Sequence, residues 1–144
     1  MISRLLVANR GEIARRVFAT CRRLGVSTVA VYTDPDADAP HVAEADVRVH
    51  LPGVRGYLDV DAILAAARTA GADAVHPGYG FLSENAEFAT AVTAAGLTWI
   101  GPPPEAVRAM GSKIESKKMM AAAGVPVLDE LPPWAVTEAQ LPVL

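Results

Sequence analysis

The stretch RLLVANRGEIARRVFATCRRLGVSTVAVYT, residues 4–33, contains a complete strand, helix and strand. The apolar run at 4–9 favours a strand, and apolar residues then recur at helical spacing over 13–24. Gly25 stands where a helix would end. The run at 27–33 is apolar almost throughout, which is typical of a strand covered on both faces. This order predicts a right-handed crossover between parallel strands.

The rest of the chain continues the alternation of short apolar runs and helical patterns. A short helical turn and a strand are expected within 42–51, strands at 72–76 and 97–100, and helices at 59–71, 83–96, 103–111 and 112–124. Strands that alternate with helices predict an α/β fold. We expect a Rossmann-like, open and mainly parallel sheet of about five strands with helices on both faces.

Residues 1–123 are predicted to form one domain, and the composition changes after them. Residues 125–144 hold four prolines and two short apolar pieces around an acidic loop. We interpret 124–144 as a linker and the start of a further domain. A native C-terminal tail is the alternative.

Composition excludes several classes of function. The chain has 144 residues, of which 51% are hydrophobic, and this suits one globular domain. Its 13 basic and 16 acidic residues favour neither nucleic acid nor an anionic membrane as a partner. The single cysteine, Cys21, cannot form a disulfide within the chain. The N-terminal apolar run is too short for a signal peptide or a membrane span, so the cytoplasm is the expected location.

Three polar segments are candidates for a binding site, because ligands bind beyond the carboxyl ends of parallel strands. The first is the turn that consists of Asn9, Arg10, Gly11 and Glu12. A glycine between a strand and a helix can present backbone N–H groups to an anion. The turn lacks the G-x-G-x-x-G spacing of a dinucleotide site, and a simple tight turn is the alternative.

The second segment, HPGYGFLSEN at 76–85, offers a donor, an aromatic face and an acid within one bend. Its candidate residues are His76, Gly78, Tyr79, Gly80, Glu84 and Asn85. The alternative is an ordinary turn in which Glu84 only interacts with the dipole of the following helix.

The third segment is GSKIESKK at 111–118. Ser112 and Glu115 have the spacing of a capping box, which predicts Ser112 as an N-cap and Lys113 as the first helical residue. A cation there opposes the helix dipole, and a bound phosphate would meet both the lysine and the helix N-terminus. A solvated lysine neutralised by Glu115 is the alternative.

Other side-chain patterns are less informative. The sequence contains no Cys/His set with zinc spacing, no G-x-S-x-G turn and no Walker A loop. Four arginines fall off the apolar stripe of the first helix and form either a solvated face or a protein contact. These are Arg15, Arg16, Arg22 and Arg23.

Taken together, three segments closely resemble biotin carboxylase. They are VANRGEIARRV at 7–17, HPGYGFLSENAEFA at 76–89 and WIGPPPEAVRAMGSKIESKKMMAAAGVPV at 99–127. In order and spacing they are most similar to the N-terminal part of the α subunit of an acetyl- or propionyl-CoA carboxylase.

The resemblance implies an enzyme that forms carboxyphosphate from ATP and bicarbonate and then carboxylates biotin on a carrier. It implies a pre-ATP-grasp domain followed by an ATP-grasp domain. By the same resemblance, Lys113 is an ATP ligand and the loop 76–85 lies at the active-site cleft. Tyr79 would lie near biotin and Glu84 near the reacting groups. The turn from Asn9 to Glu12 would face the same cleft.

The resemblance places other catalytic parts outside these 144 residues. They are the glycine-rich lid, the Mg²⁺-binding glutamates, the catalytic arginine and a second ATP lysine. The 144 residues alone are therefore expected to be inactive. The implied partners are a biotin carboxyl carrier domain or protein and a carboxyltransferase β subunit.

The assembly of the chain and its function each have an alternative. Arg16 matches a dimer contact of free-standing biotin carboxylases, but Ala19 and Arg23 depart from the usual residues there. A dimer of that kind is in doubt, and the arginine face could instead contact a carboxyltransferase subunit. The alternative function for the chain is a non-catalytic Rossmann-like platform or nucleotide-sensing module.

Overall fold

The computed structural model describes residues 1–128, without the side chain of Lys113. These residues belong to two units, one from Met1 to Gly111 and one that begins at Ser112. Each unit is described by itself. The predicted boundary between residues 123 and 124 stays a prediction.

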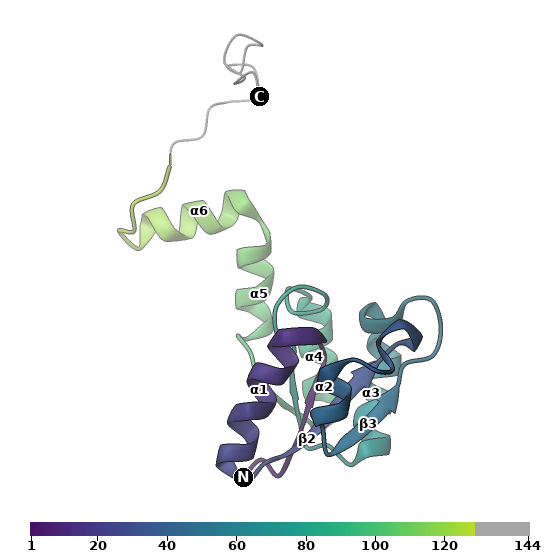
Figure 1. The fold of residues 1–144 in the computed structure, drawn as a ribbon. Coiled ribbons are helices and arrows are strands. Elements are labelled where there is room, and N and C mark those ends of the chain that lie inside the picture. Colours follow the sequence, from purple (N-terminus) through teal and green to yellow (C-terminus); the bar gives the residue numbers. More distant parts are fainter. Residues whose placement is uncertain (129–144) are drawn as a thin grey trace, which may run out of the picture. The chain divides into compact units, whose positions relative to one another are not determined.

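The first unit is built on a parallel sheet of five strands in the order β3-β2-β1-β4-β5. Figure 1 labels two neighbours of this sheet, β2 and β3. The strands are β1 Arg4–Val7, β2 Ser27–Tyr32, β3 Val47–His50, β4 Ala74–His76 and β5 Thr98–Trp99. In the central register, Leu6 lies opposite Val29 on one side and Val75 on the other. The expected open parallel sheet is confirmed.

Helices cover both faces of this sheet, as predicted. Helices α1 (Gly11–Leu24) and α2 (Pro40–Glu44) lie on one face, and α3 (Val60–Ala70) and α4 (Ala86–Ala94) lie on the other. The alternation of side chains along β1 explains the two layers. Leu5 and Val7 pack in a buried cluster with α1, and Leu6 packs in the second cluster with α3 and α4.

Helix α1 buries a narrow stripe. Ala14, Phe18 and Cys21 face the sheet, whereas Leu24 in its last turn is 72% exposed. Gly25 follows in the left-handed conformation and ends the helix, as predicted.

Helix α4 begins later than the sequence predicts. We expected it to open at Ser83, but the helix starts at Ala86 with Asn85 as its N-cap. The Asn85 side chain accepts a hydrogen bond from the backbone N–H of Phe88 at 3.0 Å. It thereby satisfies one of the backbone N–H groups in the first turn that have no partner within the helix. Glu84 therefore lies in the turn before the helix and not within it.

Short elements complete the first unit. Two 3₁₀ turns, η1 Asp34–Asp36 and η2 Gly56–Leu58, follow β2 and β3, and helix α5 (Pro104–Gly111) follows β5. Among residues 1–128, no helix combines the length and apolar character that crossing a membrane requires.

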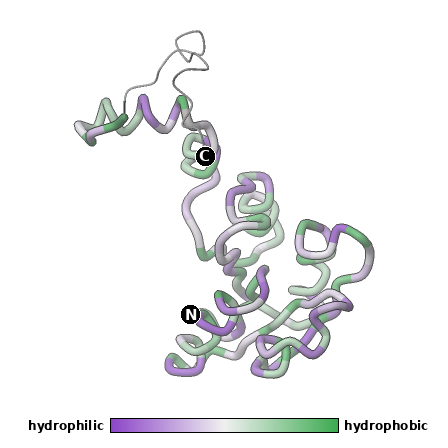
Figure 2. Tube along the Cα trace, turned by 45° about the horizontal axis from the view of Figure 1, so that its top comes forward, coloured by the Kyte–Doolittle hydropathy of each residue, from purple (hydrophilic) through white to green (hydrophobic). Residues whose placement is uncertain are grey.

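The second unit contains helix α6 (Lys113–Ala122). Its N-cap is Ser112, whose Oγ accepts from the backbone N–H of Glu115 at 3.3 Å, as predicted. Apart from Ile114, the first half of the helix is hydrophilic up to Lys118, and the residues from Met119 to Ala122 are apolar (Figure 2).

Candidate functional site

Two of the three predicted segments meet at the carboxyl edge of the sheet. The turn 9–12 follows β1 and the loop 76–85 follows β4, and these two strands are neighbours. The backbone N–H of Ala8 donates to the carbonyl oxygen of His76 at 2.8 Å, which extends the pairing past the last paired residues. The parallel register therefore brings residues that are almost 70 positions apart in sequence into one site.

Asn9 fastens the loop to the turn. Its side chain is buried, and its Nδ2 donates to the carbonyl oxygens of Pro77 at 2.9 Å and Tyr79 at 2.7 Å. Its Oδ1 accepts from the backbone N–H of Arg10 at 2.9 Å. These bonds use both kinds of group that the amide carries, so Asn9 holds the shape of the loop, and a contact of Asn9 with ligand stays a prediction.

Gly78 lets the loop approach Asn9 closely. Gly78 has φ +66°, and a Cβ added to it would lie 2.6 Å from Asn9 Nδ2. Gly80 has φ +65°, but a Cβ there would meet nothing within 4 Å. Phe81 also has a positive φ, of 46°, which is rare for a residue with a side chain. The bend is thus a constrained conformation and not a generic turn.

The imidazole of His76 is part of this constraint. Its Nδ1 accepts from the backbone N–H of Gly78 at 2.9 Å, and burial lowers the pKa of His76. Both observations favour the neutral imidazole. The ring also lines an apolar hollow of about 830 Å³ beside α1, together with Leu5, Val17 and Ile100.

Tyr79 is held by its hydroxyl and leaves its ring free. The hydroxyl donates to Glu12 Oε1 of the turn, and this bond raises the pKa of Tyr79. The residue is 60% exposed. An aromatic face with a fixed orientation is therefore available at the edge of the sheet.

Arg10 is bound by a carboxylate that the sequence analysis missed. Its Nε donates to Asp36 Oδ2 at 2.6 Å, and its Nη2 contacts the other carboxylate oxygen. The hydroxyl of Tyr57 donates to the same Asp36 Oδ2 at 2.6 Å. Asp36 is buried, and the hydrogen bond from Arg10 is the main reason that its pKa falls to about 2.

Tyr57 links this pair to the loop 76–85. Burial and the bond to Asp36 raise the pKa of Tyr57 to about 12, so the phenol keeps its proton. Its ring lies 5.2 Å, centroid to centroid, from the ring of Phe81. The only sequence signal for Asp36 was its place in an Asp-rich loop just after a strand, at the ligand side of the sheet.

The remaining residues of the loop have different positions. Asn85 caps α4, and Glu84 is exposed beside a hollow of about 170 Å³ whose lining includes Val107 and Met110 of α5. Within the first unit, no hydrogen bond or ion pair joins the Glu84 side chain to the other predicted residues of the turn 9–12 and the loop 76–85. Its predicted place near the reacting groups stays a prediction.

Lys113 is the first residue of α6 and belongs to the second unit. Its place behind the N-cap Ser112 agrees with the sequence pattern, but its role as an ATP ligand stays a prediction. Glu115, expected as a possible neutraliser of Lys113, forms an ion pair with Lys118 at 3.0 Å.

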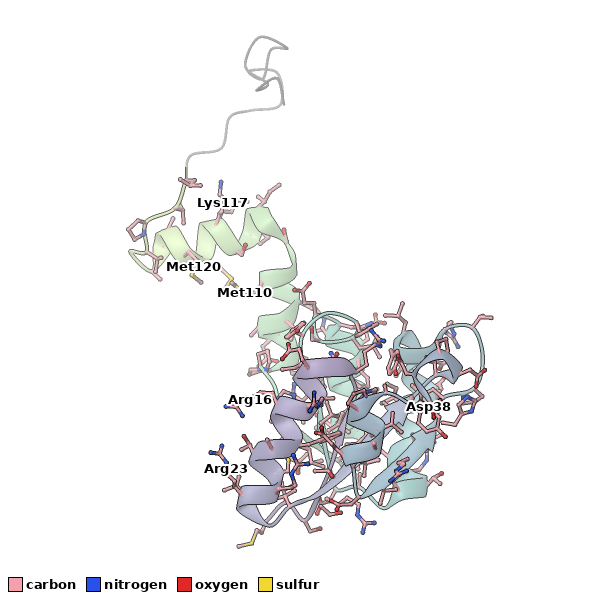
Figure 3. The ribbon with its side chains drawn as sticks, viewed as in Figure 1. Arg16, Arg23, Asp38, Met110, Lys117 and Met120 are labelled. Atoms are coloured by element: carbon pink, nitrogen blue, oxygen red, sulfur yellow. The ribbon has the colours of Figure 1, made fainter. Side chains whose placement is uncertain are left out.

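The four arginines of α1 divide into two pairs. Arg15 and Arg22 form ion pairs with Glu44 of α2, at 2.7 Å and 3.9 Å. Arg16 and Arg23 both hydrogen-bond Thr20 and point away from the sheet (Figure 3). Half of the predicted arginine face therefore forms ion pairs with a neighbouring helix, and the other half bonds only within α1.

Comparison with known proteins gives the family. The family model described as "Biotin carboxylase, N-terminal domain" matches residues 1–107. The chain is 57% identical over 130 residues to the mitochondrial methylcrotonoyl-CoA carboxylase subunit alpha of Oryza sativa subsp. japonica. It is 50% identical over 131 residues to a biotin carboxylase of Halalkalibacterium halodurans. These matches cover 88% and 89% of this chain, but only 18% and 29% of the two relatives.

Solved structures of carboxylases are similar to this chain in both fold and sequence. A single-chain, multi-domain long-chain acyl-CoA carboxylase superposes with a TM-score of 0.85 at 50% identity, over 90% of this chain and 14% of that protein. The biotin carboxylase domain of a single-chain bacterial carboxylase superposes with a TM-score of 0.83 at 46% identity, over 87% of this chain and 30% of that one. The chain belongs to the family of biotin carboxylase N-terminal domains.

Proposed function

We propose that this chain is the N-terminal domain of the biotin carboxylase component of an acyl-CoA carboxylase. That component would use ATP and bicarbonate to carboxylate biotin on a carrier protein. The observation that carries the proposal is the locked loop 76–85, which presents the Tyr79 ring at the ligand edge of the sheet. A platform without catalytic function has no need for an exposed aromatic residue held in a strained bend.

The residues present suit biotin as the ligand of this loop. Biotin has an apolar fused ring, and Tyr79 offers an exposed aromatic face whose orientation is fixed by Glu12. Phe81, 44% exposed, adds a second apolar surface in the same loop. Contact with such rings gains energy from burial and from aromatic packing.

ATP would be held by the second unit. Lys113 at the first position of α6 and the backbone N–H groups of that helix suit a phosphate, because both favour negative charge. ATP would supply the phosphoryl group that activates bicarbonate. No group of three or more His, Cys, Asp or Glu side chains in the described residues could hold a metal ion, so we derive no step through Mg²⁺. Its ligands are expected outside this chain.

The partners follow from the same assignment. A biotin carboxyl carrier domain would deliver biotin, and a carboxyltransferase β subunit would use the product. The relatives named as propionyl- and methylcrotonoyl-CoA carboxylase α subunits support this class of partner. The cytoplasm, predicted from the sequence, stays the proposed location.

The test is an assay of the complete carboxylase subunit that carries this chain. ADP release should depend on both bicarbonate and biotin, and the 144 residues alone should release none above background. Lys113→Gln should raise the KM for ATP about 10- to 100-fold, as expected for a lost charged hydrogen bond of roughly 1.5–3 kcal/mol.

The matched control is Lys118→Gln on the same helix, which breaks only an exposed ion pair with Glu115 and should leave the KM for ATP unchanged. If the complete subunit shows no biotin-dependent ADP release, the proposed function is wrong. If only Lys113→Gln behaves like wild type, the lysine is solvated and the rest of the proposal stands.

A further inference from the structure

Asp36 is a buried carboxylate between two parts of the candidate site. It is 6% exposed and accepts bonds from Arg10 on the turn 9–12 and from the Tyr57 hydroxyl of η2. A buried charge is unfavourable unless it is paired and hydrogen-bonded, and these two donors satisfy that need. The arrangement ties three segments, after β1, β2 and β3, to one side chain.

Each of the two donors to Asp36 belongs to a segment that contacts the loop 76–85. Arg10 lies between Asn9, which binds the loop carbonyls, and Glu12, which accepts from the Tyr79 hydroxyl. On the other side, the Tyr57 ring packs against Phe81 of the same loop. Asp36 is therefore linked to the loop on two sides without touching it, through the turn 9–12 and through the contact of Tyr57 with Phe81.

We propose that Asp36 is a positioning residue for biotin: by holding Arg10 and Tyr57, it fixes the loop 76–85 in the conformation that presents the Tyr79 ring. This inference rests on the proposed function. Loss of the carboxylate would release the guanidinium and the phenol together, and the loop would lose restraints at both of its contacts. A small displacement of a binding group is enough to weaken a bound substrate strongly.

The chain offers a matched control at the end of the sheet where the strands begin, opposite to their carboxyl ends. Asp73 also binds several donors, since it accepts from the backbone N–H groups of Ser3 at 2.9 Å and Arg4 at 3.0 Å and from the Ser3 hydroxyl at 2.6 Å. It precedes β4, whereas Asp36 follows β2. Asp73→Asn thus disturbs a comparable set of bonds at the other end of β4, on side chains that do not contact the loop.

The experiment compares Asp36→Asn and Asp73→Asn in the complete carboxylase subunit. We expect Asp36→Asn to raise the KM for biotin about tenfold while the KM for ATP changes much less. Asp73→Asn should lower the melting temperature and leave both constants unchanged. Tyr57→Phe, which removes one hydroxyl only, should raise the KM for biotin by a smaller factor, and it serves if Asp36→Asn does not fold. Equal biotin constants in wild type, Asp36→Asn and Tyr57→Phe would overturn the proposal.

Amide hydrogen exchange provides a readout that does not depend on activity. In Asp36→Asn, the amides of residues 76–85 should exchange at least several-fold faster than in wild type, and in Asp73→Asn they should not. Unchanged exchange in this loop would refute positioning by Asp36 even if the subunit is inactive. A wild-type subunit without biotin-dependent activity would refute only the proposed function.

Discussion

The two edges of the sheet use polar side chains in different ways. At the edge where strands begin, Asp46 accepts from the Thr28 backbone N–H at 2.8 Å and hydroxyl at 2.9 Å, and Asp73 binds Ser3 and Arg4. Each of these bonds joins the starts of two neighbouring strands. These bonds hold neighbouring strands of the sheet together, and none of them involves the turn 9–12 or the loop 76–85.

At the edge where strands end, polar bonds fix irregular backbone. Asn9 and Glu12 bind a loop that lies 67 to 70 positions away in sequence, and Asp36 joins Arg10 to Tyr57. What these bonds fix is a strained bend with an exposed aromatic ring. The difference shows that a carboxylate or amide with several hydrogen-bond donors indicates function only when the segment that it holds in place is part of a site.

The largest effect at the carboxyl edge is expected for Gly78→Ala. Alanine would have to adopt φ +66°, and its Cβ would lie 2.6 Å from Asn9 Nδ2. Strain and a displaced buried amide should together lower the free energy of unfolding by roughly 2–4 kcal/mol. Urea unfolding of the purified chain measures this.

Gly80→Ala is the control, because Gly80 has nearly the same φ but open space around its Cβ. It should cost only about 1 kcal/mol for the left-handed backbone. Equal losses for the two variants would mean that Asn9 does not lock the bend.

Asn9→Asp should have the next largest effect. The substitution keeps the shape but removes the donor to the carbonyls of Pro77 and Tyr79, and it buries a charge beside them. We expect a loss of roughly 2–3 kcal/mol in the free energy of unfolding. In contrast, Asn85→Asp keeps the acceptor that caps α4 and should change stability by less than about 0.5 kcal/mol. If Asn9→Asp leaves the free energy of unfolding unchanged, the account of the carboxyl edge is contradicted.

Acid should remove the contribution of Asp36. The pKa of its carboxyl is about 2 in the folded chain and about 3.9 when unfolded, so the stabilisation is complete above pH 4 and is lost as pH falls towards 2. Wild type should be more stable than Asp36→Asn by roughly 1–2 kcal/mol at pH 7. Unfolding curves of both at pH 7, 4 and 2.5 should show this difference shrink only below pH 4. A difference that does not depend on pH would mean that the charge of Asp36 does not stabilise the fold.

The sheet was predictable from sequence because apolar runs and helical spacing are local patterns. The start of α4 was not, because Ser83 and Asn85 are both good N-caps and only the structure shows which one accepts the bond. Asp36 and Tyr57 were missed for a different reason. Their partners lie 26 and 21 positions away, and no local pattern encodes such a pairing of side chains.

The resemblance to biotin carboxylase selected the turn 9–12 and the loop 76–85, and the structure brings these segments together. It did not show which of their residues bind ligand and which hold the backbone. Asn9, Gly78 and Asn85 were candidates for the cleft, and the structure gives each of them a role in shaping the loop.

The measurement that tests the central claim most directly is the KM for biotin of Tyr79→Ala and Tyr79→Phe in the complete subunit, with the KM for ATP and the melting temperature of each. If the exposed ring binds biotin, Tyr79→Ala should raise the KM for biotin by a factor that corresponds to roughly 1–3 kcal/mol, far more than the KM for ATP. Tyr79→Phe keeps the ring but loses the bond to Glu12 that fixes its orientation, so its biotin KM should rise, by a smaller factor than that of Tyr79→Ala. A lower melting temperature for Tyr79→Ala with an unchanged KM for biotin would contradict the account.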